Sequence, residues 1–397
     1  EVGQNQFRVD AWEAILRRLS LNRGRVLGTT CYDEETEIYT DSGWKSIGEL
    51  TDTDKVYAPD KYGVGDFEIP RRRTWERYTG KMLNFVGGRI DLCVTPNHRI
   101  LYRNGKDFYV KDATHFSQLS YRSLVIPKTI HPKFENQEYF TLPPVSHNHR
   151  WGGLFEHSAI RIPMTDWCAF MGWFLSEGSI TGSNGGSTAN GKYKVRCAQT
   201  KRNEIDKLKE DLDRLPFKWS YDGYSYCTSN KQLWSYLKQF GNCYHKYIPE
   251  EIKFSGENNL LIFIDRMICG DGSHNKKSNS FFYYTTSQRL AEDFREVCML
   301  VGISTGIKKN SSQSFQNTNG GYQPIYFVWE RKRKGGIIDH WNEINYDSYI
   351  GCVGTSTGLV LVRRNGEECI CGNTLYNWGW MKQQIYDPWK RGENADI

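Results

Sequence analysis

Two short apolar segments in the middle of the chain each end in an acidic residue followed by glycine. WCAFMGWFLSEGSI ends its apolar run at Glu177-Gly178, and FIDRMICGDGS ends at Asp271-Gly272. If both are helices packed side by side, their carboxylates lie close together. Such a pair suits a divalent cation, most naturally Mg²⁺, which activates water for phosphodiester hydrolysis. Glycine after an acid is also an ordinary helix end, so it is the repetition that favours a metal site.

Basic residues alternate with apolar ones in the segment KYKVRCAQT, which predicts a strand with one basic and one apolar face. Such a strand can lie in the major groove of DNA. A second basic run ends the segment YFVWERKRK. The residues expected to contact DNA are Lys192, Lys194, Arg196, Lys201, Arg202, Arg331, Lys332, Arg333 and Lys334. SNGGSTANG and SSQSFQNTNGG are interpreted either as hairpin loops that reach flanking DNA or as plain flexible loops.

The two acid-ending segments resemble the signature helices of LAGLIDADG homing endonucleases. The resemblance implies an α/β domain of two αββαββα repeats that cleaves double-stranded DNA with Mg²⁺. In that interpretation Glu177 and Asp271 are catalytic metal ligands. A catalytic lysine is also implied: HKYIPEEI points to Lys246, and the second repeat offers Lys332 or Lys334.

One position departs from that family. Arg266 replaces the small residue expected to face Gly172 where the two helices cross. A side chain of this size could loosen or tilt the helix pair, which affects cleavage more than fold. The alternative is therefore a domain that binds DNA without cutting it.

Three further segments frame this region. CYDEETEIYTDSGWKSIGELTDTDKVYA follows Thr30, RIDLCVTPNHRILYR places Thr95 and His98 three residues apart, and YIGCVGTSTGLVLVRRNGEECICGNT closes on Asn373-Thr374. In this order they resemble the splicing motifs of inteins. The resemblance implies an all-β, horseshoe-shaped Hint domain that excises itself from a host protein without a cofactor.

Each splicing residue has an implied role. Cys31 attacks the carbonyl before it to form a thioester, His98 protonates the leaving nitrogen, and Thr95 holds the scissile peptide. The Thr374 hydroxyl then takes the acyl group, and Asn373 cyclises to release the intein. The expected catalytic residues for splicing are Cys31, Thr95, His98, Cys352, Asn373 and Thr374.

Two positions depart from the intein pattern. Gly372 stands where the family usually has histidine, and this could slow asparagine cyclisation until the precursor stalls. Cys352 lies near a position that usually carries aspartate. The remaining cysteines of the splicing segments are interpreted as packing residues: Cys93, Cys369 and Cys371.

The motifs divide the chain of 397 residues into five parts. These are a host fragment at 1–30, splicing segments at 31–125 and 340–373, the endonuclease at 126–339, and a second host fragment at 374–397. Joined without the intein, the host fragments read GRVLGTT followed by TLYNWGW, which resembles the ATPase domain of a phage terminase large subunit. They hold no Gly-rich phosphate loop and cannot hydrolyse ATP alone.

Composition supports a soluble, multidomain protein. The net charge of +6 is too small to indicate DNA binding by itself, and the eleven cysteines lack the CxxC spacing of zinc sites. The chain has no apolar run that could span a membrane. We expect a cytoplasmic monomer whose partner is the intein-free copy of its host gene.

Overall fold

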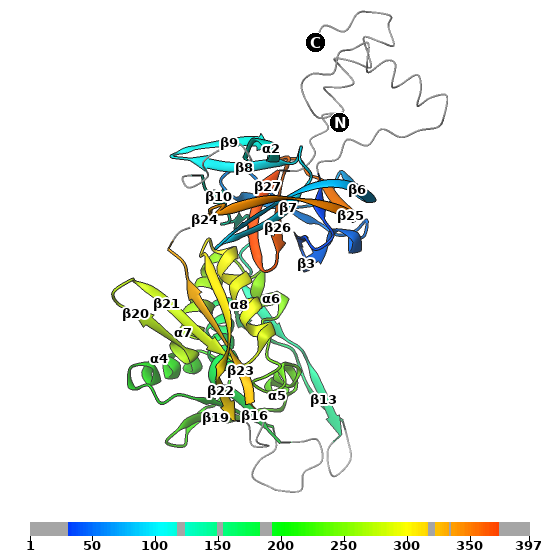
Figure 1. Cartoon of the computed structure of the whole chain (residues 1–397). Coiled ribbons are helices and arrows are strands. Elements are labelled where there is room, and N and C mark those ends of the chain that lie inside the picture. Colours follow the sequence, from blue (N-terminus) through cyan, green and yellow to red (C-terminus); the bar gives the residue numbers. More distant parts are fainter. Residues whose placement is uncertain are drawn as a thin grey trace, which may run out of the picture. The chain divides into compact units, whose positions relative to one another are not determined.

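The computed structural model describes residues 31–116, 124–148, 154–182, 193–316, 322–332 and 335–372. Contacts divide them into two compact units (Figure 1). The β unit combines the described residues up to Thr129 with those from Gly335 onward, and the α/β unit comprises Ile130–Lys334. The sequence placed 126–339 in the endonuclease. Residues at both margins belong to the β unit instead, because β10 (Ile126–Pro127) pairs with β24 (Gly335–Gly336).

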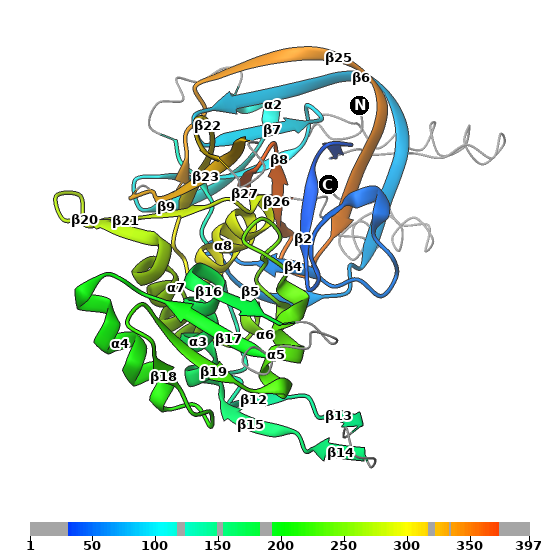
Figure 2. The same ribbon diagram turned by 90° about the horizontal axis from the view of Figure 1, so that it is seen from below.

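A closed barrel forms one part of the β unit. Its strands are ordered β1 (Tyr32–Asp33), β25 (His340–Gly354), β6 (Arg72–Gly87) and β7 (Ile90–Val94). The two long strands β6 and β25 bend together as an antiparallel ribbon, from His340 opposite Val86 to Gly354 opposite Arg72 (Figure 2). This ribbon joins the first and last segments of the unit, which lie far apart in the sequence.

A second sheet carries the end of the β unit. Its strand order within the β unit is β5-β4-β2-β26-β27, and β3 also pairs with β2. The bounds are β2 (Glu37–Thr40), β3 (Gly43–Ser46), β4 (Val56–Pro59), β5 (Val64–Glu68), β26 (Leu359–Arg364) and β27 (Glu367–Gly372). Asn365 and Gly366 join β26 to β27 with φ of 46° and 76°, the backbone that an Asn-Gly hairpin turn adopts.

Helical structure is scarce among the described residues of the β unit. The short helices η1 (Ile47–Glu49) and α2 (Ala113–Phe116) flank strands, and β8 (Arg99–Asn104) pairs with β9 (Asp107–Asp112). Both sheets share one apolar core, in which Tyr32, Phe85 and Val360 are buried. The strands of the first and last segments therefore fold as one body.

Arg364, at the end of β26, lies among three carboxylates from the first segment. Its guanidinium donates to Asp33 at 2.8 Å, to Glu35 at 2.7 Å and to Asp91. Asp33 is buried at 2% exposure, and burial raises its pKa although Arg364 opposes this. The buried acid depends on the arginine for its counter-charge.

We expect Arg364→Leu to lower the free energy of unfolding of the β unit by about 3 to 5 kcal/mol, because removing one partner of a buried pair leaves a buried charge. Urea denaturation of the purified chain measures the loss. Arg77→Leu is the matched control, since Arg77 pairs with Asp347 on the exposed part of the ribbon. It should leave the free energy of unfolding nearly unchanged, because water screens an exposed ion pair. Equal losses in both variants would contradict the buried-pair account.

The α/β unit begins with two antiparallel strand pairs. β12 (Tyr139–Leu142) pairs with β15 (Ile160–Pro163), and β13 (Val145–Asn148) pairs with β14 (Leu154–His157). β11 (His131–Pro132) precedes them. The chain then enters α3 (Met164–Glu177), whose side chains are buried on nearly every side. A helix of this composition belongs in the interior.

Two repeats follow with the same sheet topology. In the first, α3 leads into a sheet of order β16-β17-β19-β18, and in the second, α7 (Glu257–Asp271) leads into β20-β21-β23-β22. The first repeat contains β16 (Gly178–Thr181), β17 (Lys194–Ala198), α4 (Arg202–Asp213), β18 (Ser220–Tyr221), β19 (Ser225–Ser229), α5 (Lys231–Leu237), η3 (Lys238–Phe240) and α6 (Glu250–Lys253). The second contains β20 (Gly272–Asn275), β21 (Ser280–Thr285), α8 (Gln288–Leu300), β22 (Thr305–Gln316) and β23 (Tyr322–Glu330).

Two details differ from the sequence prediction. The second repeat has the order αββαββ in its described residues, without the third helix expected for it. The described part of the predicted loop SSQSFQNTNGG, residues 311–316, is strand, because β22 continues to Gln316 with an irregularity between Asn310 and Phe315. Among the described helices, none has the length and apolar character required to cross a membrane.

The helices α3 and α7 cross at glycines. A Cβ atom on Gly172 would lie 2.7 Å from the Phe263 carbonyl oxygen and 2.8 Å from the Arg266 Cβ, and one on Gly270 would lie 2.5 Å from the Ser176 Cβ. The expectation that Arg266 loosens the packing of the helix pair is therefore wrong. Only its Cβ meets Gly172, while its guanidinium turns away to the buried Asp211, with Nε 2.5 Å from the carboxylate.

Candidate functional site

The first candidate site surrounds the start of β1. Thr95, just after β7, accepts a hydrogen bond from the Cys31 N–H through its Oγ1 at 3.0 Å, and its own N–H donates to the Cys31 carbonyl at 3.0 Å. The His98 N–H donates to the Thr95 carbonyl at 2.9 Å. All three residues are buried. The structure thus brings together the three residues that the sequence assigned to the first splicing step.

The end of β27 reaches the same place. Cys371 Sγ lies 3.3 Å from His98 Nε2, and the Tyr32 ring meets the imidazole edge to face with centroids 4.4 Å apart. Burial opposes a charged thiolate, yet the hydrogen bond with Cys369 and the charge of His98 together lower the pKa of Cys371 below its usual range. The interpretation of Cys371 as a mere packing residue is therefore incomplete, because its thiol also contacts His98. No sequence motif marks this contact.

Gly372, the last described residue of β27, is also in contact with this group. Its carbonyl accepts a hydrogen bond from the Tyr32 hydroxyl at 2.8 Å. The next residues of the proposed reaction, Asn373 and Thr374, lie outside the described part of the chain, as does Thr30. Sequence motifs assign no role to Tyr32, because Tyr32 and Gly372 are 340 positions apart in the chain.

Cys352 lies in β25 and is buried in a small cluster with Cys31, Cys93, Met82 and Ile350. Its Sγ is 3.8 Å from the Val353 carbonyl oxygen. The structure therefore places Cys352 in the cluster of the expected nucleophile. Its chemical role stays a prediction.

The second candidate site lies at the ends of α3 and α7 in the α/β unit. Glu177 and Asp271 are the final residues of these helices. Burial raises the pKa of both carboxyls, and the charge of Glu177 helps to raise that of Asp271 to about 7. The two acids are thus electrostatically coupled, as the repeated motif predicts.

Two lysines cap the helices that carry these acids. Lys246 Nζ donates to the carbonyls of Phe174 and Gly178 at 2.9 and 2.8 Å. Lys201 Nζ donates to the carbonyl of Gly272 at 3.1 Å, and also to those of Cys269 and Gly270. A cation at a helix C-terminus is favourable. Both ammonium groups favour the charged carboxylates, but burial outweighs them.

The lysine assignments change in one respect. Lys246 was expected to be the catalytic lysine of the first repeat, and the structure places it, buried, at the end of the helix that carries Glu177. Lys332, the expected counterpart in the second repeat, forms an exposed ion pair with Glu330 at 2.7 Å. The lysine at the end of α7 is instead Lys201, which the sequence assigned to DNA contact.

Among the described residues that were expected to contact DNA, Lys194 and Arg196 lie on strand β17, and the others lie outside strands. In β17, Val195 and Cys197 are buried whereas Lys194 and Arg196 are partly exposed, as the alternating pattern predicts. The Arg196 guanidinium donates to Asp222 at 2.7 Å. Arg202 begins α4 and is exposed, and Arg331 follows β23 with its guanidinium 5.6 Å from the Trp329 ring centre. The remaining expected residues lie outside the described ranges: Lys192, Arg333 and Lys334.

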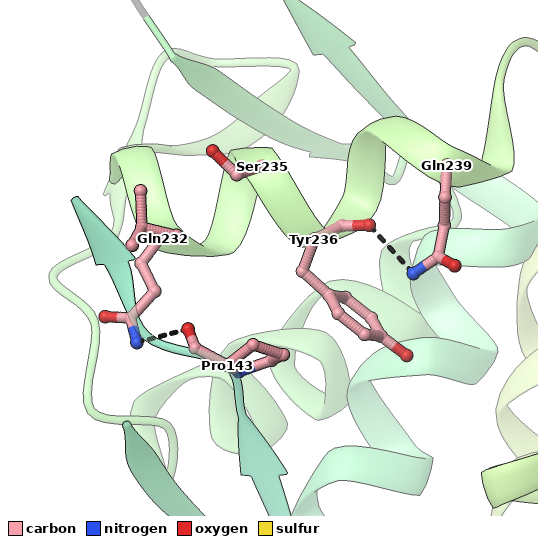
Figure 3. Close-up of a pocket in the computed structure, with 6 residues that line it drawn as sticks. Pro143, Gln232, Ser235, Tyr236 and Gln239 are labelled. Atoms are coloured by element: carbon pink, nitrogen blue, oxygen red, sulfur yellow. Dashed lines mark hydrogen bonds between the residues drawn. The ribbon is translucent and has the colours of Figure 1, made fainter. Parts of the chain in front are cut away.

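A surface hollow of about 340 Å³ lies elsewhere in the α/β unit, between α5 and the strands around Pro143 (Figure 3). The Gln232 amide donates to the Pro143 carbonyl at 2.8 Å, and the Gln239 amide donates to the Tyr236 carbonyl at 3.0 Å. These wall groups are already hydrogen-bonded to each other. None of the acids or lysines described above lines the hollow, so we assign it no function.

The chemistry of the two acids fits a divalent cation bound together with a phosphate. No group of three or more His, Cys, Asp or Glu residues is arranged as a metal cage among the described residues. Two carboxylates alone leave most coordination positions open, as in sites where Mg²⁺ also binds substrate phosphates and water. The residues that would hold the ion are Glu177 and Asp271.

The raised pKa of Asp271 makes stability depend on pH. Its value of about 7 in the folded chain lies above the ordinary aspartate value, so the folded state binds the proton more tightly. This contribution is complete below about pH 4 and is lost as the pH rises through 7. We expect the metal-free α/β unit to lose up to about 4 kcal/mol of stability from this group across that window.

Urea denaturation at pH 5 and pH 8, in the presence of a chelator, measures this effect. Asp271→Asn should flatten the difference, because an amide does not titrate. Asp265→Asn, on the same helix, provides the control. Burial raises the pKa of Asp265, but its lysine and arginine partners lower it by more, so this pKa lies below its ordinary value. If the stability of the wild type and that of Asp271→Asn changed equally between pH 5 and pH 8, the prediction would be contradicted.

Comparison with known proteins identifies residues 258–335 as a LAGLIDADG-like domain. The match begins in α7 and runs through the second repeat to β24. The chain therefore contains a LAGLIDADG-like α/β domain.

Two curated relatives match larger parts of the chain. The ATP-dependent Clp protease proteolytic subunit of Chlamydomonas moewusii is 26% identical over 303 residues, which cover 72% of this chain and 29% of that protein. The C-terminal section of a DNA-directed RNA polymerase subunit beta of Stigeoclonium helveticum is 23% identical over 413 residues, which cover 87% and 36%. The chain thus spans about a third of the length of these relatives.

Solved structures resemble less than half of the chain each. The homing endonuclease I-DmoI in complex with DNA and Mn has a TM-score of 0.30 at 16% identity, covering 42% of this chain and 90% of that one. The N-terminal LAGLIDADG domain of DUF199/WhiA has a TM-score of 0.28 at 8% identity, covering 43% and 76%. The AceL NrdHF class 3 split intein has a TM-score of 0.20 at 18% identity, covering 34% and 77%.

Proposed function

We propose that the β unit catalyses protein splicing, which excises residues 31–373 and joins Thr30 to Thr374. The observation that supports this best is the double hydrogen bond of Thr95 to the Cys31 N–H and carbonyl, each at 3.0 Å. A buried cysteine amide held on both sides is suited to backbone chemistry. His98 and the end of β27 lie against the same residues.

The first two steps transfer the host fragment from nitrogen to sulfur and then to oxygen. Cys31 Sγ attacks the Thr30 carbonyl carbon, the carbon–nitrogen bond breaks, and the Cys31 nitrogen takes a proton through His98. The Thr374 hydroxyl then attacks the thioester, and the Cys31 thiol is restored. Thr95 holds the Cys31 amide in place through these steps.

The last two steps release the intein. The Asn373 side-chain nitrogen attacks its own main-chain carbonyl, and the bond to Thr374 breaks, leaving a succinimide and a free amine. That amine attacks the ester, and an ordinary peptide bond joins Thr30 to Thr374. Neither a cofactor nor an energy source enters the balance.

The two curated relatives favour an inserted element. One carries the name of a protease subunit and the other that of a polymerase subunit, yet most of this chain aligns with part of each. A stretch shared by proteins of such different names serves a purpose independent of both. A self-excising insert has that property, and residues 1–30 and 374–397 would then be fragments of its own, terminase-like host.

Mass measurement after expression tests splicing directly. A ligated product of residues 1–30 and 374–397, together with a free fragment of residues 31–373, supports the proposal. Persistence of the intact chain with neither fragment supports the alternative, a precursor stalled at Gly372.

We also propose that the α/β unit is a homing endonuclease that cuts the intein-free host gene on both strands. The coupled carboxylates Glu177 and Asp271, at the ends of two crossing helices, favour this function. A bound Mg²⁺ would supply activated water and stabilise the leaving oxygen. The lysines Lys201 and Lys246 hold the helix ends in place, and the partly exposed face of β17 offers Lys194 to the DNA backbone.

A DNA-binding domain that has lost cleavage is the alternative. Incubation of the protein with duplex DNA that spans the joined host sequence, with and without Mg²⁺, distinguishes the two. Metal-dependent double-strand breaks support the endonuclease, whereas a gel shift without cleavage supports the alternative. Action as a monomer in the cytoplasm is part of this proposal.

A further inference from the structure

Position 372 has no room for a side chain. A Cβ atom there would overlap the Arg99 carbonyl oxygen and lie 2.8 Å from the Arg99 Cβ. The end of β27 therefore approaches the start of β8 so closely that only glycine fits. An imidazole at this position, usual in the family that the motifs resemble, would require the two strands to separate.

Two other buried side chains occupy the neighbourhood. The Tyr32 hydroxyl donates to the Gly372 carbonyl at 2.8 Å, on the peptide that leads to the asparagine. The Cys371 thiol lies 3.3 Å from His98 Nε2 and 3.6 Å from the Arg99 carbonyl oxygen. Tyr32 also packs its ring edge to face against His98. One contiguous group is therefore formed by Tyr32, His98, Cys371 and Gly372.

We propose that Tyr32 and Cys371 are positioning residues that take the place of the missing histidine and couple the two splice junctions. This rests on the splicing function proposed above. Cys371 fixes the tautomer and orientation of His98 through Nε2, since the partner of one imidazole nitrogen decides which nitrogen carries the proton. Tyr32 follows the nucleophile directly and holds the Gly372 carbonyl, so one residue connects the N-terminal junction to the strand that ends at Asn373.

The arrangement has a consequence for the order of events. His98 is correctly held only when β27 is seated, because Cys371 belongs to that strand. The first step at Cys31 therefore depends on the C-terminal segment being folded in place. Gly372 is then a requirement of the fold, and replacing it by histidine does not repair the protein.

Cleavage at each junction is measured separately to test the proposal. Tyr32→Phe should slow release at Asn373 by about tenfold or more, with thiol-induced cleavage before Cys31 changed by less than about twofold, since one hydrogen bond to the C-terminal segment is lost. Tyr57→Phe is the matched control, because the buried Tyr57 hydroxyl also donates to a glycine carbonyl, that of Gly63, at 2.8 Å. It should leave both rates unchanged.

Cys371 is tested at the other junction. Cys371→Ala should slow thiol-induced cleavage before Cys31 by about tenfold, and Cys371→Ser should restore most of it, because a hydroxyl still bonds to the imidazole. Cys298→Ala removes an equally buried thiol in the α/β unit as a control. Gly372→His should not speed release at Asn373. A faster release in Gly372→His, or equal rates in Tyr32→Phe and Tyr57→Phe, would overturn the proposal.

A spectroscopic test is independent of splicing. In the Cys31→Ala precursor, the nitrogen chemical shifts of the His98 imidazole, assigned with a His98→Gln variant, report its tautomer. Adding Cys371→Ala should shift the Nε2 signal, and adding Cys298→Ala should not. Unchanged shifts overturn the role of Cys371 whether or not the wild type splices. Absence of any cleavage in the wild type, with the expected shifts, would instead refute the splicing function alone.

Discussion

Replacing Cys31 by alanine is expected to abolish both the ligated product and thiol-induced cleavage before residue 31. Without a thiol no thioester forms, and removal of an enzymatic nucleophile costs about 10⁴-fold or more in rate. The Thr95 contacts involve the main chain of residue 31 and persist in the variant. The loss is therefore chemical, and the precursor should remain folded.

Mass spectrometry of the purified protein after incubation with dithiothreitol measures the effect. Cys93→Ala is a close control, because Cys93 lies in the same buried cluster as Cys31 and burial raises the pKa of its thiol to about 12. That variant should splice at nearly the wild-type rate. Thioester formation in Cys31→Ala, or its loss in Cys93→Ala, would show that Cys31 is not the nucleophile.

Glu177→Gln and Asp271→Asn should each reduce DNA cleavage by about 10³-fold, since each removes one charge from the proposed two-carboxylate metal site. DNA binding should be retained or slightly stronger, because both acids repel phosphate. The substitutions keep the size of the side chain, and a neutral group suits the buried position at least as well. Cleavage of a labelled duplex and a gel shift in Ca²⁺ measure the two properties.

Asp265→Asn is the control for charge on the same helix. Its carboxylate turns outward to Lys207 and Arg266, at 2.6 and 2.5 Å, so cleavage should change by less than about threefold. Equal losses in Asp265→Asn and Asp271→Asn would indicate a general effect on helix α7 rather than a metal site.

The sequence predicts the parts of the fold that depend on local pattern. The acid–Gly endings of α3 and α7 and the alternation in β17 are local, and the structure contains all three. The effect of Arg266 on the packing of α3 and α7 was predicted wrongly. The direction of its side chain depends on Asp211, which lies on another helix. A side chain of that length is accommodated when a distant carboxylate draws it away from the crossing.

In the candidate splicing site, too, sequence motifs predict some residues, whereas contacts between distant residues were missed. Cys31, Thr95 and His98 belong to motifs, and backbone hydrogen bonds bring them together. The contacts of Cys371 with His98 and of Tyr32 with Gly372 join residues some three hundred positions apart, so no spacing rule identifies them. Likewise, Lys201 reaches the end of α7 from the other repeat and was taken for a DNA contact.

The short pair β10 and β24 has a consequence for how this protein can change over time. Pro127 lies opposite Gly335, so the points where the chain leaves and rejoins the β unit are neighbouring positions of one antiparallel ladder, about 5 Å apart. A turn of a few residues could close that gap at little entropic cost. The whole α/β unit can therefore be lost or acquired as a module, and a single deletion would leave the β unit closed on itself.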